Sequence, residues 1–165
     1  MDFPTVVRNI ARTAGVAHAQ NAIRAAQGKD AAKWLADHEG ISRRTARRWM
    51  SAKAPASRGS NIITAAGVLA GATGLAAQVL RTATGIDVGT VEVEYDGESQ
   101  GTRSVGYNDV SDDMLGYLDT AARDLENHDL ESAADAFSSA VMHGYEPGLE
   151  DTLYVSDYTS GIDIR

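Results

Sequence analysis

The chain of 165 residues contains no cysteine. This absence excludes a disulfide framework, catalysis by a thiol and any metal site with a cysteine ligand. The first residues also lack the positive charges of a secretory leader, with Asp2 and Pro4 in their place and no apolar run behind them, so we expect no signal peptide. Because 43% of the residues are hydrophobic, the chain can bury a core and is not expected to be disordered.

Positive charge is scarce in the second part of the chain. Residues 1–60 hold 11 of the 15 Lys and Arg residues but only 4 of the 23 Asp and Glu residues, which is a local net charge of +7. Residues 61–165 hold the other 4 and 19, a local net charge of −15. Such asymmetry indicates a part that binds a polyanion joined to an acidic part. The overall charge of −8 conceals this division.

One long stretch, Gly59 to Leu80, carries no charge at all. Its length could span a bilayer, and Gly67 and Gly71 form a pair of small residues typical of packed membrane helices. Alanine and glycine dominate the stretch, however, and they gain little free energy in lipid. We therefore interpret it as a tightly packed core or dimer helix and expect no membrane partner.

Helical signals fill the first half of the chain. Pro4 suits a first helical position, and the pattern runs to Gln27, while Asp30 is a candidate N-cap for a helix through His38. The further expected elements are a helix over residues 43–52, a linker over 53–60 and a helix over 61–82.

After Gly85 the hydrophobic period changes to two, which is typical of half-buried strands. The expected elements are strands over 91–95 and 103–107 separated by a loop at Asp96-Gly97, helices over 112–127 and 130–143 capped by Ser111 and Asp129, and closing strands near 153–155 and 162–164.

The strongest functional signal lies between Ala31 and Trp49. Gly40 can form a tight turn between two short helices, as a helix-turn-helix motif requires. At roughly 100° per residue, the four arginines of the second helix fall within an arc of about 140°. Ala46, Trp49 and Met50 fall between about 240° and 340° on the same projection. This helix therefore has one cationic face and one apolar face.

Arginine can donate two hydrogen bonds to guanine and also pairs with phosphate. Double-stranded DNA is therefore the expected partner. We assign contacts with base edges to Arg43, Arg44 and Arg47, and contacts with phosphates to Arg48, Lys53, Ser42 and Thr45. The alternative is a solvated cationic face on an ordinary helical bundle.

The expected fold class is α+β. It consists of an N-terminal helical helix-turn-helix domain (residues 1–58), an alanine/glycine-rich helix or linker (59–84) and a small acidic α/β domain (85–165).

The segment 40–49 resembles helix-turn-helix motifs of plasmid and phage regulators. It is also similar to the corresponding motif of the telomere terminal proteins of linear Streptomyces replicons. That similarity extends to Gly106-Tyr107 before Ser111-Asp112-Asp113, to the two helices that follow, and to the closing segments 153–155 and 162–164.

The resemblance implies a mechanism. A terminal protein binds telomeric DNA, and one of its side-chain hydroxyls accepts the first nucleotide from a DNA polymerase. The family acceptor is a threonine before two acidic residues, and Ser111 occupies the matching position here. The alternative role of Ser111 is only that of a helix N-cap. The polymerase would supply the metal ions for this phosphoryl transfer.

Other signals for catalysis are weak. The four histidines lack paired ligand spacing, no P-loop or serine triad is present, and Asp109, Asp112 and Asp113 have no histidine or lysine beside them. We therefore expect no enzyme activity, metal or cofactor.

Three functions stay open from the sequence. The first is a terminal-protein-like factor at replicon ends of a plasmid, phage or chromosome. The second is a plasmid- or phage-encoded regulator whose C-terminal domain dimerises, and the third is an adaptor that binds an acidic protein. A DNA-binding protein of the first two kinds would lie in the cytoplasm with the nucleoid.

Overall fold

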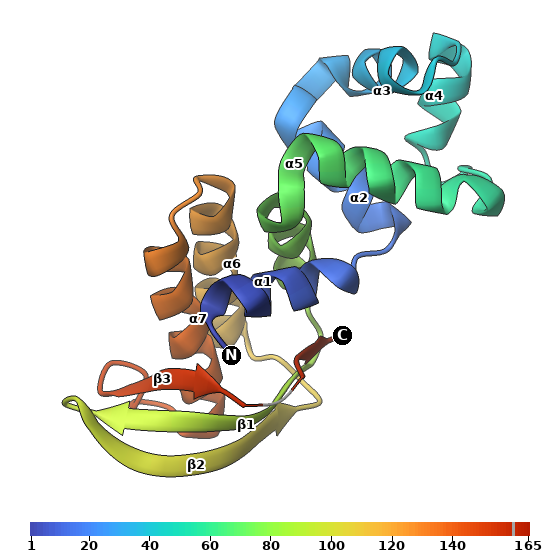
Figure 1. The fold of residues 1–165 in the computed structure, drawn as a ribbon. Coiled ribbons are helices and arrows are strands. Elements are labelled where there is room, and N and C mark those ends of the chain that lie inside the picture. Colours follow the sequence, from blue (N-terminus) through green and yellow to red (C-terminus); the bar gives the residue numbers. More distant parts are fainter. Residues whose placement is uncertain (160) are drawn as a thin grey trace.

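The computed structural model describes residues 1–159 and 161–165. A group of helices lies at one end of the molecule and a sheet at the other (Figure 1). Within the described residues the helices are α1 (Phe3–Arg12), α2 (Val16–Gln27), α3 (Ala31–Glu39), α4 (Arg43–Trp49), α5 (Gly59–Arg81), α6 (Asp112–Glu126) and α7 (Leu130–Tyr145). The strands are β1 (Ile86–Tyr95), β2 (Glu98–Tyr107), β3 (Leu153–Tyr158) and β4 (Asp163–Ile164).

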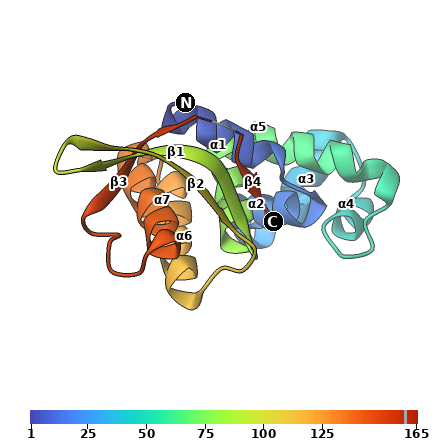
Figure 2. The ribbon, with the colours of Figure 1, turned by 90° about the horizontal axis from the view of Figure 1, so that it is seen from below.

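The sheet is antiparallel throughout. Its strand order is β2-β1-β3, and β4 pairs with the beginning of β1. Helices α6 and α7 pack together across one face of the sheet (Figure 2). This arrangement confirms the α+β class. The expectation of a small α/β domain was wrong in that detail, because a consecutive hairpin and a returning strand produce antiparallel pairing without βαβ crossovers.

Alternation along the strands places apolar side chains against the helices. Val91 and Val93 of β1 are buried, whereas Glu92 between them is partly exposed. Phe137 of α7 is fully buried, and its ring lies 5.9 Å from that of Tyr158 on β3. The hairpin between β1 and β2 closes in two residues, Asp96 and Gly97, rather than in a longer loop.

The continuous helix expected from Pro4 to Gln27 was wrong. The chain breaks at residues 13–15, because Thr13 Oγ1 donates back to the carbonyl of Ile10 (2.8 Å) and Gly15 begins α2 as its N-cap. The Gly15 N–H donates to Nδ1 of His18 at 3.0 Å, which satisfies a donor at the new helix start. Asp30 precedes α3 as expected, but its side chain makes no capping hydrogen bond.

Helix α5 matches the apolar helix expected over residues 61–82, but it is kinked. Gly71 has φ 66° and ψ −174°, outside the helical region. The segment Ala56–Arg81 is long and apolar enough to cross a membrane, and half of its most apolar window is buried. Its neighbours are α1, α2 and α6. Half of this window is thus packed against other helices of the fold.

Helix α1 packs with the C-terminal part as well as with α5. The ring of Phe3 lies 6.0 Å from that of Phe137, and the N-terminal amine pairs with the carboxylate of Asp157. The buried apolar residues accordingly form one connected cluster along the chain. Domain boundaries at residues 58 and 84 stay predictions.

Candidate nucleic-acid interface

The turn between α3 and α4 is built from local signals. Gly40 adopts the left-handed conformation, with φ 66° and ψ 36°, and ends α3. Ser42 begins α4, because its Oγ accepts a hydrogen bond from the N–H of Thr45 at 3.1 Å. The hydroxyls of Ser42 and Thr45 also lie 2.9 Å apart and hydrogen bond to each other. Both residues thus stabilise the start of the helix, as well as being candidates for phosphate contacts.

The apolar face of α4 packs into the helical end of the core. Ala46 is fully buried, Trp49 is 6% exposed, and Leu35 of α3 is fully buried beneath them. The guanidinium of Arg58 lies over the Trp49 ring, 5.7 Å from its centroid. This packing fixes which side of α4 faces solvent.

Helix α2 holds the C-terminal end of α4. Gln20 is 7% exposed, and its Nε2 donates to the carbonyls of Trp49 (2.7 Å) and Ser51 (2.9 Å). The Arg24 guanidinium donates to the carbonyl of Met50. Orphan carbonyls at a helix end need such partners. The hydrogen bonds from Gln20 and Arg24 also explain why α4 ends at Trp49 rather than at the predicted residue 52.

Sequence reasoning missed Gln20 and Arg24 as positioning residues. A signal was available for the first, because Gln20 shares the inward face of α2 with Ala19 and Ile23, and an amide on an apolar face needs a partner. Arg24 is exposed, so nothing in the sequence marks it as a residue that supports α4.

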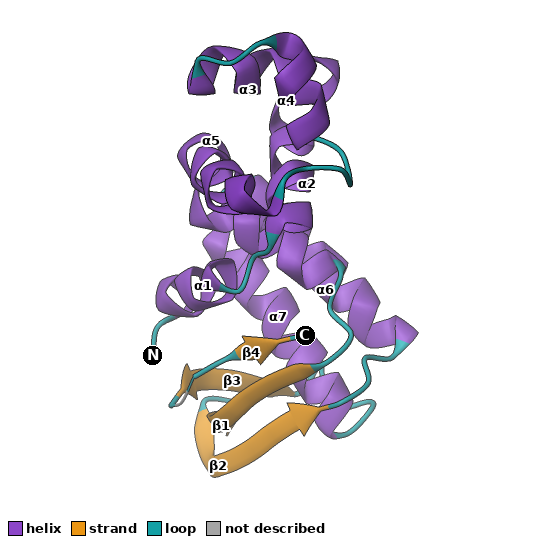
Figure 3. Ribbon diagram, turned by 90° about the vertical axis from the view of Figure 1, so that its right-hand side faces the viewer, coloured by secondary structure: helices purple, strands orange, loops and turns teal. Residues whose placement is uncertain are grey.

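The opposite face of α4 carries the four predicted arginines, and the predicted cation Lys53 follows the end of the helix. All are exposed, and in the described part of the chain none forms an ion pair or hydrogen bond with a carboxylate: Arg43, Arg44, Arg47, Arg48 and Lys53. Helix α4 lies at the end of the molecule away from the sheet (Figure 3). The acidic part therefore does not neutralise these side chains, and they stay available to an external polyanion.

Ser111 lies elsewhere, at the start of α6. Its Oγ accepts a hydrogen bond from the N–H of Met114 at 3.2 Å, so the capping role is present. The side chain is exposed and lines a shallow hollow that it shares with Asp113 and His143. The structure thus does not bring Ser111 into the cationic surface of α4.

His143, a histidine that the sequence left unassigned, has two acidic neighbours, Glu150 and Asp113. His143 Nδ1 lies 2.8 Å from Glu150 Oε1, and Nε2 lies 3.6 Å from Asp113 Oδ2. The hydrogen bond from His143, together with backbone N–H donors, lowers the pKa of Glu150 to about 2. No group of three or more His, Asp and Glu residues suited to a metal ion occurs in residues 1–159 and 161–165.

No protein-family model matches the chain, and neither a curated protein nor a solved structure matches it.

Proposed function

We propose that the protein binds double-stranded DNA through α4, with α3, the Gly40 turn and α4 acting as a helix-turn-helix motif. The observation that supports this proposal is a row of exposed, unpaired arginines opposite the buried Ala46 and Trp49. Ordinary surface cations are interspersed with carboxylates, whereas this face has none. A surface of one sign attracts a polyanion and aligns it before contact.

The dimensions of α4 suit the major groove. With its side chains an α-helix is about 10–12 Å across, and the major groove is about 12 Å wide. In this pose Arg43, Arg44 and Arg47 reach base edges. Arg48 and Lys53 lie beside phosphates. The acidic part lies at the other end of the molecule, where its repulsion disfavours duplex that approaches from that side (Figure 1).

Fluorescence anisotropy with a pool of labelled duplexes tests the proposal. Affinity should fall steeply as salt is raised, because counterions are released from each phosphate contacted. For a selected sequence, Arg44→Ala and Arg47→Ala should each cost about 1–3 kcal/mol of binding free energy. Arg103→Ala, on β2, is the matched control and should bind like the parent protein. If all three variants bind duplex as tightly as the parent protein, the interface lies elsewhere.

The terminal-protein hypothesis adds a covalent step at Ser111. Its hydroxyl is exposed, and it acts as the acceptor in the capping hydrogen bond, which leaves its own proton free to depart. In the transfer, Ser111 Oγ attacks the α-phosphate of a deoxynucleoside triphosphate, a phosphoester bond forms, pyrophosphate leaves and the hydroxyl proton passes to solvent. The test is incubation with a DNA polymerase from a linear replicon and a radioactive deoxynucleotide. Label that survives denaturation and disappears in Ser111→Ala supports the hypothesis. Absence of label from every hydroxyl residue removes it without affecting DNA binding.

A dimeric regulator is the second candidate function. Val68, on the first half of α5, is 67% exposed and is therefore free to contact a second copy of the chain. Selection of bound sequences from random duplex separates the candidates, since a dimer selects two half-sites about one helical turn apart. A protein-binding adaptor predicts no binding of duplex even at low salt.

A further inference from the structure

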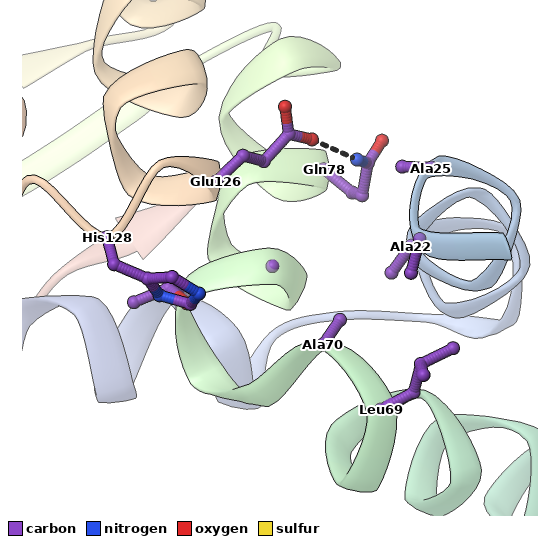
Figure 4. Close-up of a pocket in the computed structure, with 10 residues that line it drawn as sticks. Ala22, Ala25, Leu69, Ala70, Gln78, Glu126 and His128 are labelled. Atoms are coloured by element: carbon purple, nitrogen blue, oxygen red, sulfur yellow. Dashed lines mark hydrogen bonds between the residues drawn. The ribbon is translucent and has the colours of Figure 1, made fainter.

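A hollow of about 250 Å³ lies between α2, the kink of α5 and the turn that joins α6 to α7 (Figure 4). Its walls are small and apolar on two sides, with Ala22 and Ala25 from α2 and Leu69 and Ala70 from α5. The hollow lies at the kink of α5, because its lining includes Leu69 and Ala70 before Gly71 and Thr73 and Gly74 after it. Gly71 has a positive φ of 66°, where other residues are strained, so the kink is a built feature of the chain.

One polar side chain in the hollow has an unused hydrogen-bond acceptor. Gln78 is 7% exposed, and its Nε2 donates to Glu126 Oε1 at 3.0 Å. Glu126 is held in turn by two hydrogen bonds from the Arg81 guanidinium, which fixes the direction of the Gln78 amide. Gln78 Oε1 accepts from no side chain or backbone group in the described residues, and Figure 4 shows this oxygen on the side of Ala25. In the described residues no side-chain nitrogen or oxygen atom is both buried and without a partner, so Gln78 Oε1 is accessible and can accept a hydrogen bond from a molecule in the hollow.

We propose that this hollow binds a small neutral molecule with a flat apolar body and one N–H or O–H group that donates to Gln78 Oε1. Size supports this class, because an apolar cavity of about 150 Å³ accepts benzene, so a bicyclic ring suits the larger space here. The carboxylate of Glu126 disfavours an anionic ligand. It is already paired with Arg81, so it offers little to a cationic one.

The position of the hollow connects it with the surface of α4. Helix α2 contributes Ala22 and Ala25 to the wall, and the same helix carries Gln20 and Arg24, which hold the end of α4. A ligand inserted between α2 and α5 therefore alters the support of α4. This regulatory consequence rests on the proposed DNA binding, whereas the binding site itself does not.

Indole and benzofuran form a matched pair of probes, since both are flat bicycles and only indole carries an N–H. We expect saturable shifts of the backbone amide signals of Ala22 and Leu69 when indole is added to the full chain at about 0.1–1 mM. Benzofuran should bind about five- to tenfold more weakly, because it cannot donate to Gln78. Equal binding of the two probes, or no shift with indole, would overturn the proposal.

Two variants test the residues. Gln78→Met removes the acceptor at nearly constant volume and should erase the difference between the probes. Ala25→Leu fills the hollow and should abolish the binding of both, while Ala17→Leu, at an exposed position of the same helix, should leave it intact. If Ala25→Leu still binds indole, the ligand lies elsewhere.

The regulatory consequence has a separate readout. Saturating indole should change duplex affinity at least threefold in the parent protein and not in Ala25→Leu. If indole binds but duplex affinity stays constant, the site stands and its coupling to α4 is wrong. If no duplex binds at all, the proposed function fails while the NMR result remains valid.

Discussion

The two ends of the molecule use charged side chains in different ways. Around α4, the cations have no carboxylate partner in the described residues. In the acidic part, by contrast, Arg81 bridges to Asp119 and Glu126, and His143 lies between Glu150 and Asp113. Paired charges there join α5 to α6 and α7 to the following loop. The charges of α4 therefore contribute little to the fold and are free for a partner, whereas these paired charges of the acidic part link its elements.

The largest expected effect comes from the neutral hydrogen bonds that hold α4. Gln20→Leu leaves the carbonyls of Trp49 and Ser51 without their donor in a largely buried place. We expect a loss of about 2–3 kcal/mol in the free energy of unfolding, measured by urea denaturation. Gln27→Leu, at the end of the same helix, is the control and should change it by less than about 0.5 kcal/mol. Similar losses in both variants would show that α4 does not depend on Gln20.

The second prediction compares a paired arginine, Arg81, with an unpaired one, Arg47. The Arg81 side chain is 31% exposed and forms a two-pronged pair with Glu126, which raises its pKa. Arg81→Met should lower the free energy of unfolding by about 1–2 kcal/mol and leave duplex affinity unchanged. Arg47→Met should do the reverse, with a change in stability of less than about 0.5 kcal/mol and weaker duplex binding. Chemical denaturation measures the stability of both variants and fluorescence anisotropy measures their duplex affinity. The same pattern in both variants would contradict the division into structural and free charges.

The third prediction compares a glycine from each end. Gly40 has φ 66° and free space around it, so Gly40→Ala should cost about 1 kcal/mol from backbone conformation alone. Gly116 lies inside α6, also with free space, and Gly116→Ala should add about 0.5–1 kcal/mol. Thermal unfolding should therefore shift in opposite directions. A gain at both positions would contradict the turn geometry at Gly40.

The smallest effect is a pH dependence in the acidic part. The pKa of Glu150 is about 2 in the fold against an ordinary value of 4.5, so the unfolded chain takes up the proton first as the pH falls. The stabilisation is complete above pH 4.5 and is lost as the pH approaches 2. Glu150→Gln lacks this contribution. The difference in Tm between parent and variant should accordingly shrink over that range, and a constant difference would refute the role of His143.

Local signals in the sequence predicted the helix starts well. Ser42, Ser111 and Asp129 each accept a hydrogen bond from the N–H three residues later, as expected from N-caps. The α+β class followed from the change of period after Gly85. The two-faced character of α4 also followed, since residues on one helical turn have fixed angular positions.

Signals from distant residues were missed. The end of α4 depends on Gln20, which is 29 positions from Trp49 in the chain. The break at residues 13–15 arises from Thr13 and Gly15, and single residues of these types also occur inside helices. Sequence pattern alone had no means to weigh these against the helical period.

By itself the sequence determined the order of helices and strands after residue 30, the partition of charge and the face of α4 that carries arginine. Only the tertiary structure decided that the acidic part leaves those arginines unpaired, that α2 holds the end of α4, and that a hollow lies beside Gln78 at the kink of α5. The physical reason is distance along the chain. Caps and amphipathic faces involve neighbours three or four residues apart, whereas Gln78 meets Glu126 across 48 positions, and that meeting depends on how the whole chain packs.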